Sequence, residues 1–264
     1  MARWVPTEGK AMMNIPRSVL RLILGKRLPL TTGDLAVSGI EAPVRIRRDA
    51  FGVAYIDAAG DIDAWYGLGF CHGQDRAFQL EALKRVVNGT LAELVGPDGL
   101  AIDRLSRRIG FAHSAAEQLE VLDDDVRAMG DAYARGVTEG ATLGSVKPAH
   151  EFALLKTGPT RYMAADAIGM LKLMSFLLAS NWDSELVRYK ILTQDGPEAL
   201  LALDPTYPDW LPATISPGEP AGSAIDALAS DLERFSSVVG LGGGSNNWAI
   251  SGSRTATGRP IVAN

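Results

Sequence analysis

A serine that follows a run of glycines is the feature of this sequence with the clearest chemical meaning. Ser245 comes directly after Gly242-Gly243-Gly244 and lies just ahead of a segment that reads as a strand. A serine hydroxyl is a weak nucleophile unless a base removes its proton. If the peptide bond before Ser245 is cut, the freed α-amino group, which titrates not far above neutral pH, can act as that base. The spacing therefore favours one residue that supplies both nucleophile and base.

Gly244 has a role of its own in such a cut. Without a Cβ it can adopt dihedral angles that let the Ser245 hydroxyl approach the preceding carbonyl carbon. We expect an N-to-O acyl shift at this bond, followed by hydrolysis that leaves Ser245 as a new N-terminus. The alternative is a serine in an ordinary glycine-rich turn. A phosphate-binding loop does not fit, because no Lys-Ser or Lys-Thr pair follows the glycines.

Two separated blocks of sequence resemble one known family. Ser245-Asn246-Asn247-Trp248-Ala249-Ile250-Ser251-Gly252-Ser253 is similar to the start of the β chain in the penicillin acylase family, whose members are N-terminal-nucleophile amide hydrolases made as self-cleaving precursors. Arg48-Asp49-Ala50-Phe51-Gly52, Gln74-Asp75-Arg76-Ala77-Phe78 and Gly89-Thr90-Leu91-Ala92-Glu93 resemble the opening of the family's α chain. The likeness runs from about Val44 to Asn264.

The resemblance implies a reaction and a set of site residues. Ser245 would be the catalytic nucleophile and Gly244 the residue before the processed bond. The reaction would convert an acyl amide of the penicillin type, an N-acyl-homoserine lactone or an acyl peptide into a carboxylic acid and an amine. The oxyanion donors would lie past Asn264, and the substrate-binding residues are unknown. One apolar segment matches a stretch that lines the acyl pocket in the family and equally fits a plain helical core: Met170, Met174, Phe176, Leu177 and Leu178.

A structural Ca²⁺ is the one cofactor that the resemblance implies, and no organic cofactor is expected. Glu185, in Asn181-Trp182-Asp183-Ser184-Glu185, matches a glutamate that related α chains use as a calcium ligand. Because calcium takes about 6–8 oxygen ligands, the others would belong to the β chain. The alternative is a first-turn glutamate favoured by the helix dipole.

The remaining polar residues that could do chemistry are predicted to be structural. A metal site or a Ser–His–Asp triad needs clustered histidines, and those of this chain follow no ligand spacing. A single cysteine excludes an internal disulfide. A polar triplet ahead of an apolar helical stripe is expected to bind backbone groups and carboxylates. These residues are His72, His113 and His150; Cys71; and Gln74, Asp75 and Arg76.

Charge is distributed unevenly along the chain. The net charge is −5, yet residues 1–48 hold nine Lys or Arg against three Asp or Glu. The acidic remainder argues against nucleic acid as a partner. Basic residues interrupt the apolar run near the N-terminus, so no clear signal peptide is present and a cytoplasmic location is favoured over a periplasmic one. An amphipathic helix packed on the body is favoured there over a helix lying on a membrane.

The pattern of elements predicts an α+β protein that is mostly helical. Alternation over 44–47 and 53–56 predicts a short N-terminal hairpin. A helical stripe ends at Asn88-Gly89, and Thr90-Leu91-Ala92-Glu93 is a capping-box sequence. Further helices are predicted around 99–108, 115–139, 164–178, 183–203 and 224–235. The expected divisions are a basic N-terminal extension (1–43), a helical α-chain-like region (44–204), a proline-rich spacer (205–244) and the start of a β-chain-like nucleophile strand (245–264).

The resemblance also implies what surrounds these elements. The complete fold would be an αββα sandwich, of which this chain holds an incomplete part. Since Asn264 is only the twentieth residue counted from Ser245, we expect a fragment or a truncated gene product. After processing, its partners would be its own β chain and a small acylated amide. One alternative is an inactive homologue that acts only as a binding or structural fragment; another is a helical protein that uses its basic N-terminal segment at a membrane surface.

Overall fold

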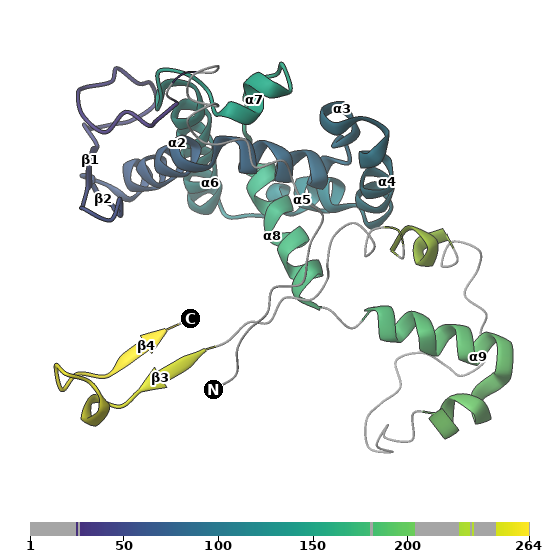
Figure 1. Ribbon diagram of the computed structural model, residues 1–264. Coiled ribbons are helices and arrows are strands. Elements are labelled where there is room, and N and C mark those ends of the chain that lie inside the picture. The colour runs from purple at the N-terminus through teal and green to yellow at the C-terminus, as the bar shows by residue number, and fades with distance from the viewer. Residues whose placement is uncertain are drawn as a thin grey trace. The chain divides into compact units, whose positions relative to one another are not determined.

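The computed structural model describes residues 25, 27–179, 182–203, 227–232, 234 and 247–263. The chain divides into unit 1 (Met1–Arg85 and Ala112–Ile168) and unit 2 (Val86–Phe111 and Gly169–Asn264). The described residues are mostly helical with two small sheets, in agreement with the predicted α+β class, and they form no αββα sandwich by themselves (Figure 1). The elements are β1 (Arg45–Arg48), β2 (Ala54–Asp57), α2 (Asp61–Asn88), α3 (Ala92–Val95), α4 (Leu100–Ile109), α5 (Phe111–Glu120), α6 (Asp124–Leu143), α7 (His150–Leu154), α8 (Ala164–Ala179), α9 (Trp182–Leu203), β3 (Trp248–Ile250) and β4 (Ile261–Ala263), with 3-10 turns at Gly96–Gly99 and Gly252–Arg254.

The two strands of unit 1 form the predicted hairpin. Strands β1 and β2 pair antiparallel, with Ile46 opposite Ile56. Asp49 closes the turn, because its carboxylate accepts the backbone N–H groups of Phe51 at 2.9 Å and Val53 at 3.0 Å. Ile46 packs on a core cluster of Tyr66, Phe70 and Ala132. The alternation in the sequence therefore sets which side of the hairpin meets the helices.

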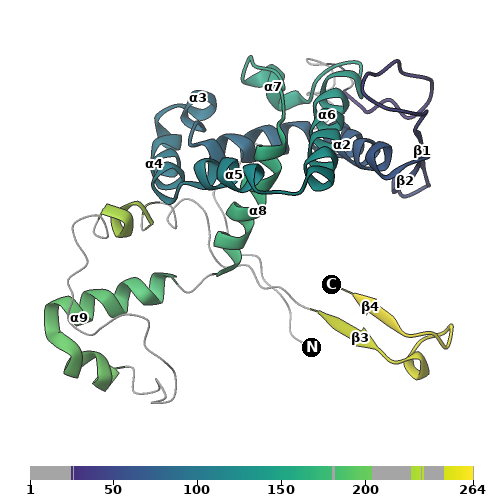
Figure 2. The same cartoon turned by 180° about the vertical axis from the view of Figure 1, so that it is seen from behind.

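Helices α2 and α6 cross at unusually close range, and glycines make the crossing possible (Figures 1 and 2). A Cβ on Gly69 or Gly73 of α2 would lie well under 3.0 Å from a backbone carbonyl oxygen of α6. The same holds in reverse for Gly136 and Gly140 of α6 against the carbonyls of α2. Each pair is spaced by four residues, which places both glycines on one side of its helix. Only glycine lets two helix backbones approach so closely.

Buried carboxylates fasten the loops of both units to their helices. In unit 1, Asp63 accepts the backbone N–H groups of Glu41 and Ala42, each at 2.9 Å. In unit 2, Asp103 accepts those of Leu91 at 2.6 Å and Ala92 at 2.9 Å. Each buried carboxylate thus accepts two consecutive backbone N–H groups of a neighbouring segment.

The capping box predicted at Thr90 does not form. Helix α3 begins at Ala92, its N-cap is Leu91, and no side chain caps it. Asp103, twelve residues or so along the chain, accepts the N–H groups instead. The predicted stop at Asn88-Gly89 is confirmed: Gly89 has φ +62°, a left-handed conformation that glycine adopts at no steric cost.

The single helix predicted over 115–139 is wrong, because the structure has two helices there. α5 ends at Glu120 and α6 begins at Asp124. The Arg127 guanidinium donates to the carbonyl oxygens of Glu120 at 3.1 Å and Leu122 at 3.4 Å. These bonds satisfy backbone acceptors that an uninterrupted helix would have paired internally. α7 was not predicted at all, and α9 bends at Gly196, just before Pro197.

The core of unit 2 gathers around Ile102, Leu105 and Leu232. Leu232 belongs to the helical residues 227–232, the described part of the helix predicted over 224–235. Phe176 and Trp182 pack on the same cluster, with their rings stacked at a centroid distance of 6.2 Å and an interplanar angle of 12°. Among the described helices of both units, none is long and apolar enough to cross a membrane.

Candidate functional site

The two residues expected to carry out self-processing, Ser245 and Gly244, lie outside the described residues, as does most of the spacer 205–244. The description resumes at Asn247, and β3 begins at Trp248. The segment after Ser245 is therefore a strand, as the sequence predicts. Ser245 stands three positions ahead of that strand in the sequence.

Strand β3 belongs to a hairpin whose connection, residues 251–260, includes the 3-10 turn. It pairs antiparallel with β4, with Trp248 opposite Ala263 and Ile250 opposite Ile261. The connecting turn is held internally, because the Thr255 hydroxyl bonds to the Arg259 carbonyl oxygen at 2.8 Å and to that of Gly252 at 3.1 Å. The turn therefore holds β4 beside β3.

Glu185, the expected calcium ligand, lies in the first turn of α9. Its carboxylate is exposed and accepts a hydrogen bond from the Arg188 guanidinium at 2.7 Å. In the part of the chain that the structure describes, no three His, Cys, Asp or Glu side chains gather as a metal site requires. One carboxylate beside a cation does not fit Ca²⁺ without further oxygen ligands.

The apolar residues expected near the acyl pocket divide into two sets along α8. Phe176 and Leu177 pack against the core cluster of unit 2, and Phe176 also meets Phe111 edge-on at 5.6 Å. Met174 and Leu178, in contrast, are 53% and 65% exposed. Leu171, which the sequence analysis did not single out, is 70% exposed. Positions 171, 174 and 178 share one side of a helix, so the part of α8 that belongs to unit 2 presents an exposed apolar stripe.

All three residues of the polar triplet Gln74, Asp75 and Arg76 were predicted to be structural, and the first two belong to a polar network. Arg48 of β1 forms a bidentate pair with the Asp75 carboxylate, with both distances 2.9 Å, and donates to Gln74 Oε1 at 2.7 Å. The Gln74 amide donates to the carbonyl oxygens of Leu30 and Gly144. The guanidinium that pairs with a carboxylate here thus comes from the hairpin, while Arg76 interrupts the regular α2 dihedrals.

Each of the three histidines contacts a different group. His72 Nδ1 lies 3.0 Å from the Tyr133 hydroxyl, and His150 lies 3.3 Å from the Gly25 carbonyl oxygen. His113 is exposed beside Glu117. Cys71 is buried, and burial raises the pKa of its thiol. These placements agree with the structural roles predicted for them.

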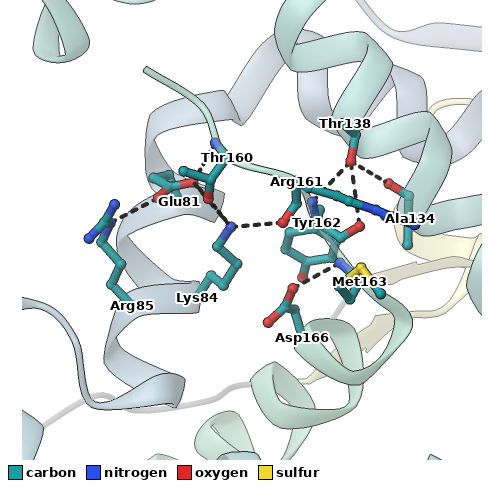
Figure 3. A network of polar contacts seen from close by, with 10 residues as sticks. All are labelled: Glu81, Lys84, Arg85, Ala134, Thr138, Thr160, Arg161, Tyr162, Met163 and Asp166. Carbon is teal, nitrogen blue, oxygen red and sulfur yellow. Dashed lines mark hydrogen bonds and ion pairs between the residues drawn. The ribbon is translucent and has the colours of Figure 1, made fainter. Parts of the chain in front are cut away.

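A buried ionic network centred on Glu81 was not predicted from the sequence (Figure 3). Glu81 is only 4% exposed, and its Oε2 accepts the backbone N–H of Thr160 at 3.0 Å and the Thr160 hydroxyl at 2.8 Å. Its other oxygen accepts from Arg85 Nε at 2.8 Å. Lys84 Nζ lies 3.3 Å from Glu81 Oε2 and donates to the Thr160 hydroxyl and, at 3.0 Å, to the Arg161 carbonyl oxygen.

Hydrogen bonds decide the charge state of Glu81. Burial alone raises the pKa of this carboxyl, but the two bonds from Thr160, with Lys84 and Arg85 close by, outweigh burial and lower the pKa below its usual range. Glu81 is therefore ionised at neutral pH, and its negative charge is met by two cationic side chains. The signal in the sequence was the Glu81, Lys84, Arg85 spacing, which puts one acid against two bases on a single helix face.

Most of the chain is similar to proteins of one family. The model of the penicillin amidase family matches residues 43–264. A penicillin acylase 2 proenzyme of Pseudomonas sp. (strain SE83) is 35% identical over 256 residues, 92% of this chain and 32% of that relative. An acyl-homoserine lactone acylase, QuiP, of Pseudomonas aeruginosa is 31% identical over 249 residues, 90% of this chain and 29% of that relative. A solved structure of a thermostable penicillin G acylase from Alcaligenes faecalis aligns with a TM-score of 0.47 and 23% identity, over 69% of this chain and 98% of that chain.

The chain spans about a third of the length of the curated relatives that it matches. The matched range takes in the hairpin β1–β2, every described helix, and the segment from Ser245 through β4.

Proposed function

Because this chain belongs to the penicillin amidase family, we propose that the protein is a self-processing hydrolase of acyl amides in which Ser245 is both the cleavage site and the nucleophile. The observation that carries the proposal is the position of Ser245. It lies inside the matched range, directly after glycines and three positions ahead of β3, which begins an ordered hairpin.

Processing would start with the Ser245 hydroxyl attacking the carbonyl carbon of Gly244. The peptide nitrogen leaves as the amine of Ser245 while an ester forms on its oxygen. Water then hydrolyses that ester, which releases the Gly244 carboxylate and frees both the hydroxyl and the α-amino group of Ser245. The glycine at 244 supports this step, because it places no side chain beside the attacked carbonyl.

Turnover would repeat the same chemistry on a substrate. The α-amino group takes the proton of the Ser245 hydroxyl as the oxygen attacks the amide carbonyl, and the proton passes to the departing amine. The acyl group remains on Ser245 as an ester until water releases it as a carboxylic acid. No oxyanion donor is assigned among the described residues.

The names of the relatives and the exposed apolar residues of α8 both bear on the class of substrate. The two curated relatives are named for penicillin and for acyl-homoserine lactones, both acylated amides. The exposed apolar stripe of Leu171, Met174 and Leu178 supports an apolar acyl group. We therefore propose an amide whose acyl side is hydrocarbon and whose amine side is small and polar.

A structural Ca²⁺ bound partly by Glu185 is a second part of the proposal. Its carboxylate is exposed and can serve as one oxygen ligand of Ca²⁺. The other oxygen ligands would come from outside the described residues. Formation of that site would require the Arg188 guanidinium to release Glu185.

The activity is tested with the protein expressed from its complete reading frame. Phenylacetyl and N-acyl-homoserine lactone amides are incubated with the wild type, Ser245→Ala and Ser253→Ala. Ser253 is a matched control, since its hydroxyl lies in the β3–β4 turn and contacts Ser251 at 3.0 Å. We expect amine release from at least one amide by the wild type and Ser253→Ala, and none by Ser245→Ala. An active Ser245→Ala variant would contradict the proposal, and an inert wild type would point to a homologue without activity.

A further inference from the structure

A short helix, residues 227–232, lies in the stretch of chain that was predicted to be a proline-rich spacer (Figure 1). We call it the spacer helix. Leu203, at the end of α9, is 70% exposed. In the spacer helix, in contrast, Asp231 and Leu232 are only 5% and 3% exposed, and the other four residues are partly or fully buried. Because a plain connecting segment runs over the surface, this burial indicates that the spacer helix is part of a folded core.

The residues that cover the spacer helix belong to its own unit. Leu232 forms the buried core cluster of unit 2 with Ile102 and Leu105 of α4. Leu228, one turn earlier in the spacer helix, packs on the same cluster. Since Leu228 and Leu232 are four residues apart, both lie on one side of the spacer helix. Side chains of α8 and α9 pack on this cluster as well: Phe176, Leu177, Trp182 and Leu186.

An ion pair adds to these apolar contacts. Asp231 Oδ2 lies 3.1 Å from Nε of Arg108, which belongs to α4. A buried carboxylate needs a cation close by, and Arg108 supplies it. Removal of the spacer helix would expose Ile102 and Leu105 to water and would take this carboxylate away from Arg108. The spacer helix and α4 therefore match each other in both apolar contact and charge.

We propose that the spacer helix is a permanent part of unit 2 and stays bound to α4 after the chain is cut before Ser245. This rests on the proposed function, in which that cut occurs. The chain on the N-terminal side of the cut would keep the spacer helix and continue past it into residues 233–244. Any later trimming would be confined to residues outside 227–232. Self-processing would thus free Ser245 without releasing the spacer helix.

Hydrogen exchange of the spacer helix before and after the cut tests this. The exchange of residues 227–232, read by mass spectrometry, is compared between the processed wild type from the complete reading frame and the uncut Ser245→Ala variant. The intact masses of the processed chains show whether the spacer helix is still present. A synthetic peptide of residues 224–235 gives the exchange rate without the contacts of unit 2.

Two substitutions of one leucine weaken the contact, and a matched substitution leaves it intact. Leu232→Asp places a charge in the core of unit 2, and Leu232→Ala is the milder change if Leu232→Asp fails to fold. Leu203→Asp is the control, because it makes the same change at an exposed leucine of the same unit.

We expect the processed wild type to retain residues 227–232 and to exchange them as slowly as the uncut chain does, at least about 100-fold more slowly than the peptide. The Leu232 variants should exchange them at least about tenfold faster than the wild type, and Leu203→Asp should match the wild type.

A processed protein that lacks residues 227–232, or that exchanges them as fast as the free peptide, would overturn the proposal. A wild type that stays uncut would instead count against the proposed function. That chain is then opened at a protease site inserted before Gly242, and exchange in the opened chain still decides whether the spacer helix stays bound.

Discussion

The α-carbon of Gly140 in α6 lies against the carbonyl oxygen of Phe70 in α2, so close that a Cβ on Gly140 would clash with that oxygen. The contact is reciprocal along the crossing, since Gly73 of α2 meets the carbonyl of Val137 in the same way. At this crossing the two helices pack backbone against backbone, without side chains between them. This brings Cα–H groups close to carbonyl oxygens of the other helix. The two helices carry much of unit 1, including Glu81, Lys84 and Thr138.

Gly140→Ala is expected to destabilise the protein by about 2–3 kcal/mol, because the added methyl group must push α2 and α6 apart. Gly130→Ala is the matched control in the same helix. Its Cβ would meet only the Ala164 Cβ, at 3.4 Å, and alanine favours a helix over glycine. Chemical denaturation of the two variants checks this. Equal midpoints for both would show that the crossing tolerates a methyl group.

Glu81→Gln is expected to lower stability by about 3 kcal/mol at pH 7, since the neutral amide leaves Lys84 and Arg85 without their buried anion. Because the pKa of Glu81 is lowered in the folded state, its stabilisation is complete above the ordinary glutamate range and is lost as pH falls through the folded pKa. The difference in unfolding free energy between wild type and variant should therefore shrink below that range.

The difference in unfolding free energy between the wild type and Glu81→Gln is measured by urea unfolding between pH 3 and 7. The exposed carboxylate of Glu117, changed to Gln, provides the control and should alter stability by less than about 0.5 kcal/mol. A wild-type advantage over Glu81→Gln that is constant across the whole range would contradict the assigned charge state.

Two residues of α8 should respond differently to truncation. Phe176→Ala removes a ring that stacks on Trp182 and packs on the core of unit 2, at an expected loss of about 3 kcal/mol. Met174→Ala, at an exposed position, should change stability by less than about 1 kcal/mol and instead alter acyl preference. Thermal unfolding separates the two. A large loss for Met174→Ala would place that side chain in the core and not in a pocket.

The calcium proposal predicts a chelator effect on the protein from the complete reading frame. EDTA should lower its unfolding temperature, and Glu185→Ala should show a low unfolding temperature that EDTA no longer changes. Glu198→Ala, an exposed glutamate of the same helix, should behave as the wild type. An unfolding temperature that does not respond to EDTA in any of the three proteins would remove Ca²⁺ from the account.

Local patterns in the sequence predicted the elements that local forces determine. The alternation of apolar and polar residues around Ile46 and Ile56 predicted the hairpin, and Asn88-Gly89 predicted the end of α2. Both predictions were correct because strand alternation and the backbone conformation of glycine depend only on neighbouring residues. Where a side chain outside the pattern binds the backbone, the local pattern was misleading. Asp103 accepts the N–H groups of Leu91 and Ala92 in place of a capping box at Thr90. The helix predicted over 115–139 is interrupted where Arg127, a few residues along the chain, donates to carbonyl oxygens of the turn.

Tertiary contacts explain what the sequence analysis missed. Gly69, Gly73, Gly136 and Gly140 give no local sign that they form a helix crossing, since each pair gains its meaning only from the other helix. Glu81 and Lys84 look like an ordinary surface pair until Thr160 is brought beside them. Of the predicted site residues, Glu185 lies on an exposed helix turn, while Ser245 and Gly244, which were predicted from the family resemblance, lie outside the described residues.

The central claim, that Ser245 is released as an N-terminal nucleophile, is tested most directly by intact-mass analysis and N-terminal sequencing of the product of the complete reading frame. The account predicts two chains, of which one begins Ser245-Asn246-Asn247. A single uncut chain in the wild type, or cleavage at the same bond in Ser245→Ala, would contradict it.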